Sequence, residues 1–175
     1  MKPAHLVLAV AMSGCFVTGT AELAPPRAGE LPSPNVASIA TPLGELFDFP
    51  ADALTSHASL ARMDDEAMCF DLLIRRPVML PKDDRPLVLK ISVEVDGAPA
   101  NQIDRALPTC TAELPCLPPD SALQRFVAET DRRVRVEGER LCFPRLPRPR
   151  RELVLGARPG VTGWKFRFRL TGGAG

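Results

Sequence analysis

The chain has 175 residues, the length of one domain, and 45% hydrophobic with 25% charged residues is enough to support a core. Its formal charge of +1 provides no broad electrostatic field, which argues against nucleic acid as a partner. Five cysteines make an odd number, and 19 prolines are about twice the usual share of roughly 5%. None of these values points to a specific activity.

The first fifteen residues have the layout of a secretory signal. A positive end at the amino group and Lys2 precedes an apolar run from Ala4 to Met12, interrupted only by His5. The run is far shorter than the roughly 20 residues of a stable transmembrane helix, and no later segment replaces it. We therefore expect residues 1–14 to be a signal peptide that is removed.

The residues Met12-Ser13-Gly14-Cys15 resemble the lipobox of bacterial lipoproteins, in which small residues precede an invariant cysteine and Leu is preferred where Met12 stands. The resemblance covers the leader alone. It implies that Cys15 receives a diacylglyceryl group, that cleavage falls before it and that its new amine is acylated, which anchors the protein durably in a membrane. Because Phe16 and not Asp follows, the resemblance to enterobacterial sorting favours the outer membrane.

The alternative for the leader is ordinary secretion with a later cut. Gly19-Thr20-Ala21 offers small residues around a cleavage site after Ala21, and the product would be a soluble periplasmic or secreted protein. A third alternative is a leader that forms a helix and is not exported. An unmodified mature chain that begins at Glu22 would exclude the lipid anchor.

Residues 15–42 are rich in helix and strand breakers. Prolines at positions 25, 26, 32, 34 and 42 lie within eighteen residues, among Gly, Ala and Ser. This composition favours an extended, semi-rigid spacer. We expect a lipid-anchored flexible tether over 15–42, a folded domain over 43–171 and a disordered tail over 172–175. The alternative for the tether is a loop packed on the domain.

Within the domain, apolar and polar residues alternate with the period of half-buried strands. The three clearest runs lie at 68–75, 87–95 and 164–170, and the last carries Trp164, Phe166 and Phe168 on its apolar face. Shorter runs are expected at 133–136, 140–143 and 153–155, with another at 59–63, where a helical turn is the alternative. Asp96-Gly97, Glu137-Gly138 and Arg158-Pro159-Gly160 are expected to form turns, the second of them a hairpin that joins 133–136 to 140–143.

About seven short strands with Pro-rich connections predict an all-β fold, a small antiparallel β-sandwich of Ig-like architecture. Strands do not alternate with long amphipathic helices, which argues against a parallel α/β sheet. At most one short helix is expected, within 120–131, where Leu123, Phe126 and Val127 have helical spacing.

Lipidation of one cysteine leaves an even set, Cys69, Cys110, Cys116 and Cys142, which in an exported domain predicts two disulfides. Three connectivities are possible, and a local Cys110–Cys116 bridge would leave Cys69 with Cys142. Both of the latter thiols point away from the apolar faces, so a bridge between neighbouring strands or to a covering loop fits better than an inter-sheet bridge. Free thiols and a metal site are the alternatives, although the spacing is not that of a zinc site.

Residues with catalytic chemistry are few. His57 is the single histidine after Cys15, we expect it at the surface, and no nucleophile-elbow, HExxH, Walker or dinucleotide motif occurs. A Ser/His/Asp triad built from dispersed residues stays open. The acidic triplet Asp64-Asp65-Glu66, with Asp71 beyond, is expected to be a solvated turn rather than a calcium site. We predict no catalytic residue, no metal and no cofactor.

The basic stretch Phe143–Arg151 holds four arginines and no acid. Arg145, Arg148, Arg150 and Arg151 are candidates for binding phosphate or carboxylate groups on an envelope glycan or lipid, and a solvated connection is the alternative. No aromatic residues are interleaved with these arginines, which argues further against nucleic acid.

The leading hypothesis is a non-catalytic envelope lipoprotein, attached to the membrane through its lipid, whose sandwich binds another envelope protein or a glycan or serves an assembly. A small exported hydrolase and a carbohydrate-binding module are the alternatives. A pocket around His57 with a Ser or carboxylate at hydrogen-bonding distance would favour the hydrolase, and a basic or apolar patch without a cleft would favour the interaction module.

Overall fold

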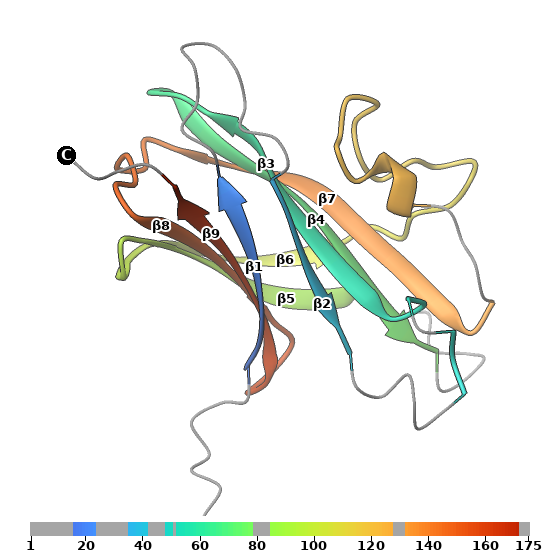
Figure 1. The fold of residues 1–175 in the computed structure, drawn as a ribbon. Helices are drawn as coiled ribbons and strands as arrows, with labels where there is room; N and C mark the ends of the chain where they lie inside the picture. Colours follow the sequence, from blue (N-terminus) through green and yellow to red (C-terminus); the bar gives the residue numbers. More distant parts are fainter. Residues whose placement is uncertain are drawn as a thin grey trace, which may run out of the picture.

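The computed structural model describes residues 16–23, 35–41, 48–50, 52–78, 85–127 and 132–171. Two sheets pack face to face (Figure 1), a five-stranded sheet in the order β1-β9-β8-β5-β6 and a four-stranded sheet in the order β2-β3-β4-β7. The strands are β1 (Phe16–Leu23), β2 (Val36–Ala40), β3 (Thr55–Met63), β4 (Ala67–Pro77), β5 (Leu87–Val95), β6 (Ala98–Leu107), β7 (Val134–Pro144), β8 (Glu152–Arg158) and β9 (Gly163–Leu170), with one 3₁₀ turn, η1 (Gln124–Phe126).

This architecture confirms the predicted small β-sandwich. All paired strands are antiparallel except β1 and β9, which run in the same direction. The order β9-β8-β5-β6 matches strands G-F-C-C′ of an immunoglobulin-type domain, and β3-β4-β7 matches A-B-E. The run at 59–63 is strand, as part of β3, and the short helix predicted within 120–131 is the single 3₁₀ turn η1 in the described part of that range.

The tether predicted over 15–42 is wrong for the two parts of it that the structure describes. β1 pairs with β9 along its whole length, from Phe16 opposite Gly163 to Leu23 opposite Leu170, and β2 pairs with β3. Four of the prolines fall between these strands, so the apolar alternation on either side is uninterrupted and buries Ala21, Leu23, Ala37 and Ile39 in the core. The sandwich therefore begins at Phe16 and not at residue 43, while 1–15, 24–34 and 172–175 lie outside the described residues.

The hairpin predicted at Glu137-Gly138 is also wrong. β7 runs straight through both residues, and Gly138 lies opposite Leu73 of β4. A side chain at Gly138 would collide with the Leu72 carbonyl, so this glycine serves close packing instead of a turn. The turn at Asp96-Gly97 does form between β5 and β6, and both residues have the positive φ that such a tight turn requires.

Successive strands run in opposite directions, so the connections gather at two ends of the sandwich (Figure 1). The Phe16 end holds the start of β1 and the connections β2–β3, β4–β5, β6–β7 and β8–β9. The Leu23 end holds the end of β9 and the connections β1–β2, β3–β4, β5–β6 and β7–β8. The two ends of the sandwich are therefore separated by the length of the strands.

The main core lies between the sheets and contains the predicted apolar faces. Phe70 of β4 packs against Phe143 and Phe168, with ring centroids 6.2 and 5.8 Å apart. A second cluster lies on the outer face of the four-stranded sheet, where the β6–β7 connection covers Leu54, Leu73 and Val136 with Leu117 and Leu123. None of the described segments is a helix of the length and apolarity of a membrane span.

Candidate functional site

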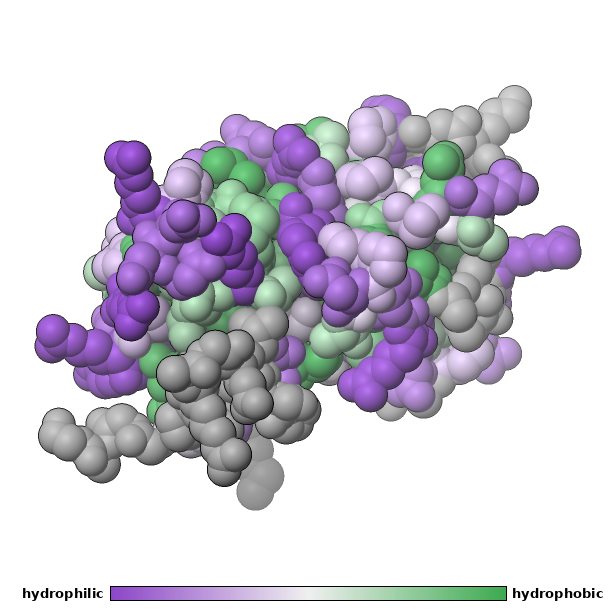
Figure 2. Space-filling model, turned by 90° about the horizontal axis from the view of Figure 1, so that it is seen from above, coloured by the Kyte–Doolittle hydropathy of each residue, from purple (hydrophilic) through white to green (hydrophobic). Residues whose placement is uncertain are grey.

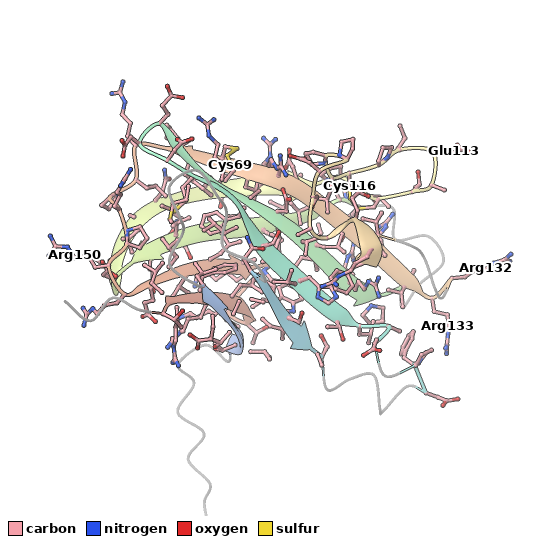
Figure 3. All side chains as sticks on the ribbon, turned by 45° about the horizontal axis from the view of Figure 1, so that its top comes forward. Cys69, Glu113, Cys116, Arg132, Arg133 and Arg150 are labelled. Atoms are coloured by element: carbon pink, nitrogen blue, oxygen red, sulfur yellow. A yellow bond between two sulfur atoms is a disulfide. The ribbon has the colours of Figure 1, made fainter. Side chains whose placement is uncertain are left out.

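The cysteines predicted to form disulfides are paired in the structure. Cys69 and Cys142 lie directly opposite each other on β4 and β7 and are bridged on the outer face of the four-stranded sheet. Cys110 and Cys116 close a local ring in the β6–β7 connection, which Figure 3 shows above the sheet. Cys15 lies outside the described residues. Both bridges stabilise the face of the four-stranded sheet that points away from the main core.

The four arginines of the basic stretch separate into two pairs. Arg148 contacts Asp65 of the acidic turn, with Nη2 2.7 Å from Oδ1, and the backbone N–H of Arg145 donates to the Glu66 carbonyl. The acidic and basic turns therefore meet at the Leu23 end. The acidic turn is exposed, as predicted, and no group of three metal-ligating side chains occurs among the described residues.

Arg150 and Arg151 line a pocket of about 700 Å³ at the same end, together with Arg169 at the end of β9. In Figure 3, Arg150 lies at the opposite end of the sandwich from Arg132 and Arg133. None of the three lining arginine side chains forms an ion pair with another described residue. The remaining lining residues are Glu22, Asp96, Gly97, Glu152 and Leu170.

Asp96 fixes the backbone of this pocket. Its carboxylate accepts hydrogen bonds from the N–H groups of Arg150, Arg151 and Glu152 at 2.9, 2.7 and 3.0 Å. Burial alone would raise the pKa of Asp96, but these three bonds outweigh it and hold the pKa below its usual range. These bonds tie the arginine-bearing turn to the β5–β6 turn, and the pocket brings three arginines together with the carboxylates of Glu22, Asp96 and Glu152.

A second concavity of about 540 Å³ lies on the outer face of the five-stranded sheet. Gly156 makes room for it, because a Cβ there would collide with the Ser92 hydroxyl. Lys90, Arg158 and Lys165 surround the hollow. Sequence reasoning missed this hollow, because it depends on the register between strands and on a bulge at Val93/Glu94.

The prediction that His57 lies at the surface is wrong, because this residue is only 5% exposed. Its Nδ1 lies 2.7 Å from the hydroxyl of Ser38, which stands opposite it on β2, and its ring stacks on Phe126 at 3.8 Å. Burial, and then the charges of Arg75 and Arg125, lower the pKa of His57 to about 4, although Asp52 acts in the opposite direction. A neutral imidazole beside a hydroxyl is the arrangement of a nucleophile with its base.

Two other features bear on the alternatives. The described aromatic side chains are buried or half-buried, so none of them offers the exposed stacking surface expected of a carbohydrate-binding module. Figure 2 shows one face of the molecule, where hydrophilic side chains separate the hydrophobic areas from one another.

The comparisons with known proteins find no matching family model, curated protein or solved structure.

Proposed function

We propose that the chain is the precursor of a lipid-anchored bacterial envelope protein whose β-sandwich is a non-catalytic binding or assembly module, with the outer membrane as its location. One observation carries this proposal: β1 begins at Phe16, the residue that follows the lipobox cysteine Cys15. Cleavage before Cys15 leaves the sandwich whole and places the acylated residue next to its first strand.

The alternative cut after Ala21 is incompatible with this fold. It would remove Phe16–Ala21, six of the eight residues of β1, and would leave most of β9 without a partner on that side. It would also remove Ala21 itself from the core. A secreted form cut at that site would therefore lack an integral strand of the sandwich.

The binding role is supported by the arginine pocket at the Leu23 end. Arg150, Arg151 and Arg169 converge there on a backbone that Asp96 holds in place. Guanidinium groups bind phosphate and carboxylate with paired hydrogen bonds. The ligand class that fits is an anionic group on an envelope glycan, lipid or protein, and the two disulfides suit an oxidising compartment.

The anchor is tested by expressing the full chain in a bacterial host and measuring the intact mass of the mature protein. We expect cleavage before Cys15 and the added mass of the acyl groups, whereas Cys15→Ser should abolish lipidation. Met12→Leu, which restores the preferred lipobox residue, should be processed at least as well as the native chain. An unmodified protein beginning at Glu22 contradicts the proposal.

The binding role is tested by capturing partners of the lipidated protein from its own envelope. Arg150→Ala/Arg151→Ala should lose the captured anionic component, and Arg145→Ala/Arg148→Ala should retain it, because those two arginines lie outside the pocket. Equal capture by both double variants contradicts the pocket as the binding site.

One observation favours a second candidate, a small exported hydrolase, namely the 2.7 Å contact between Ser38 and His57. Against it, no described carboxylate lies at hydrogen-bonding distance of His57 to orient the ring. A fluorophosphonate probe that labels the native protein but not Ser38→Ala would establish the hydrolase, and absence of labelling would exclude a reactive serine.

A further inference from the structure

The exposed hydrophobic side chains of the described residues are concentrated at one end. Five large ones are exposed, and four of them, Val17, Val78, Val88 and Val161, lie at strand ends or turns of the Phe16 end. The fifth, Leu114, lies in the β6–β7 connection. The end of the sandwich at which β1 begins (Figure 1) is thus also the apolar end of the described residues.

Three apolar residues adjoin the first strand directly. Val17 lies opposite Trp164, the single tryptophan of the chain, in the β1–β9 ladder. Trp164 is half-buried, and Val161, on the adjacent β8–β9 turn, is 79% exposed. We call Val17, Val161 and Trp164 the anchor-side patch. A tryptophan with one face on the protein and another outside is typical of membrane–water interfaces.

Basic residues also lie near this end, on the outer face of the five-stranded sheet. Arg158 ends β8 just before the turn, Lys90 lies opposite it on β5, and Lys165 follows Trp164. Asp104 on β6 lies opposite Lys90 and is the acidic residue among these cross-strand neighbours. The acidic turn at Asp64–Glu66 lies at the other end of the molecule. Basic side chains near an apolar end match an anionic membrane surface, which attracts Lys and Arg within a Debye length.

The length of chain available fixes the distance to the membrane. Phe16 is paired with Gly163 in the ladder, so only residue 15 itself separates the lipid from the sandwich. One residue spans at most about 3.6 Å, so the sandwich must lie directly at the surface of the bilayer.

We propose that the Phe16 end rests on the lipid bilayer, with the anchor-side patch among the headgroups and Arg158 and Lys90 beside anionic phosphates. This inference rests on the proposed lipid anchor. It adds an orientation: the arginine pocket at the Leu23 end points away from the membrane, where a component of the envelope can reach it.

Trp164 is the reporter for this contact because the chain has no other tryptophan. The lipidated protein is reconstituted in vesicles of phosphatidylethanolamine and phosphatidylglycerol, with either ordinary or brominated acyl chains. We expect Trp164 emission to shift to shorter wavelength on reconstitution and to lose intensity with the brominated lipid. Val161→Asp and Arg158→Glu should reduce both effects while the protein still floats with the vesicles.

Arg150→Glu is the matched control, because it makes the same charge change at the opposite end and should leave Trp164 quenching unchanged. Equal emission with ordinary and brominated lipid, in a protein that floats with the vesicles, overturns the inference but leaves the anchor intact. Failure to float, with a mature mass that lacks acyl groups, overturns the proposed anchor and the membrane contact with it.

Discussion

Asp71 and Arg140 face each other on β4 and β7, and the guanidinium of Arg140 donates two hydrogen bonds to the two carboxylate oxygens of Asp71, at 2.7 and 3.0 Å. Asp71 is fully buried, and Arg140 also reaches Asp120 at 3.2 Å. The hydrogen bonds that Arg140 donates to Asp71 raise the pKa of the Arg140 guanidinium above its ordinary value. The pair lies two residues along the strands from the Cys69–Cys142 bridge, so one ladder carries both cross-links.

Removing the buried carboxylate should be costly. In Asp71→Asn the half-buried guanidinium of Arg140 loses its fully buried charged partner and keeps only the exposed Asp120, and we expect the free energy of unfolding to fall by about 3 kcal/mol. Asp65→Asn is the control, because the Asp65–Arg148 pair is mostly exposed and should contribute less than about 1 kcal/mol. Urea denaturation of the two variants measures the difference. Equal losses of unfolding free energy would contradict the claim that the Asp71–Arg140 pair stabilises the fold because it is buried.

The two disulfides should differ in their effect on stability. Cys69 and Cys142 are separated by 73 residues in sequence, and Cys110 and Cys116 by 6. Loop-closure entropy then gives about 4 kcal/mol for the first bridge and about 2 kcal/mol for the second. Denaturation of the double-alanine variants measures this order, and a larger loss from removing Cys110–Cys116 would show that its ring holds the covering connection by packing.

Gly19 tests whether β1 is packed as an integral strand. A Cβ at this position would collide with the Ser38 carbonyl and lie 2.7 Å from Ile39 Cγ1, so Gly19→Ala must push β1 away from β2. We expect a loss of about 1–3 kcal/mol in unfolding free energy. At Gly160 no atom lies within 4 Å, and Gly160→Ala should change stability by less than about 1 kcal/mol. If Gly19→Ala leaves the free energy of unfolding unchanged, β1 is not packed as an integral strand.

Much of the fold follows from short-range pattern. The alternation in β5 and β9 predicts both strands and their buried faces, and thiols facing away from the core predict the cross-strand bridge. β6 escapes prediction because Ala98–Leu107 is an edge strand, exposed along most of its length, so its residues do not alternate. β1 and β2 are not predicted from the sequence, because the prolines between them dominate the composition of the whole segment.

The candidate sites could not be foreseen, because they depend on contacts distant in sequence. The pocket joins Glu22, Asp96 and Arg169, which the β1–β9 ladder and the β5–β6 turn bring together. His57 is buried because Phe126, in a connection 69 residues further along, stacks on it. Nothing local to Leu54–Ser59 distinguishes this histidine from an exposed one.

The burial of His57 predicts a pH dependence of stability. Its pKa is lowered to about 4 in the folded protein against 6.5 in the unfolded chain, so the unfolded state binds the proton more readily. Stability should therefore fall as the pH decreases from about 6.5 to about 4, by a total of about 3 kcal/mol. In His57→Gln the stability should change much less over this pH range. Thermal unfolding at several pH values measures this difference.

The carboxylates act at a lower pH and do not obscure this window. The lowered pKa values of Asp64 and Asp96 mean that their contributions are complete above about pH 4 and are lost only below it. A native protein whose stability is unchanged between pH 6.5 and 4.5 would indicate that His57 is reached by solvent.

The parallel pairing of β1 with β9 has a mechanical consequence. Phe16 lies at one end of this ladder of eight residue pairs, and Leu170, next to the C-terminal residues, lies at the other. A force that pulls on the N-terminal residue while the C-terminal side is held slides the strands along each other, so the interstrand hydrogen bonds share the load together. The antiparallel pair β8–β9, pulled at its open ends, would unzip one bond at a time. The strand that follows the proposed anchor is thus joined in the geometry that best resists extraction.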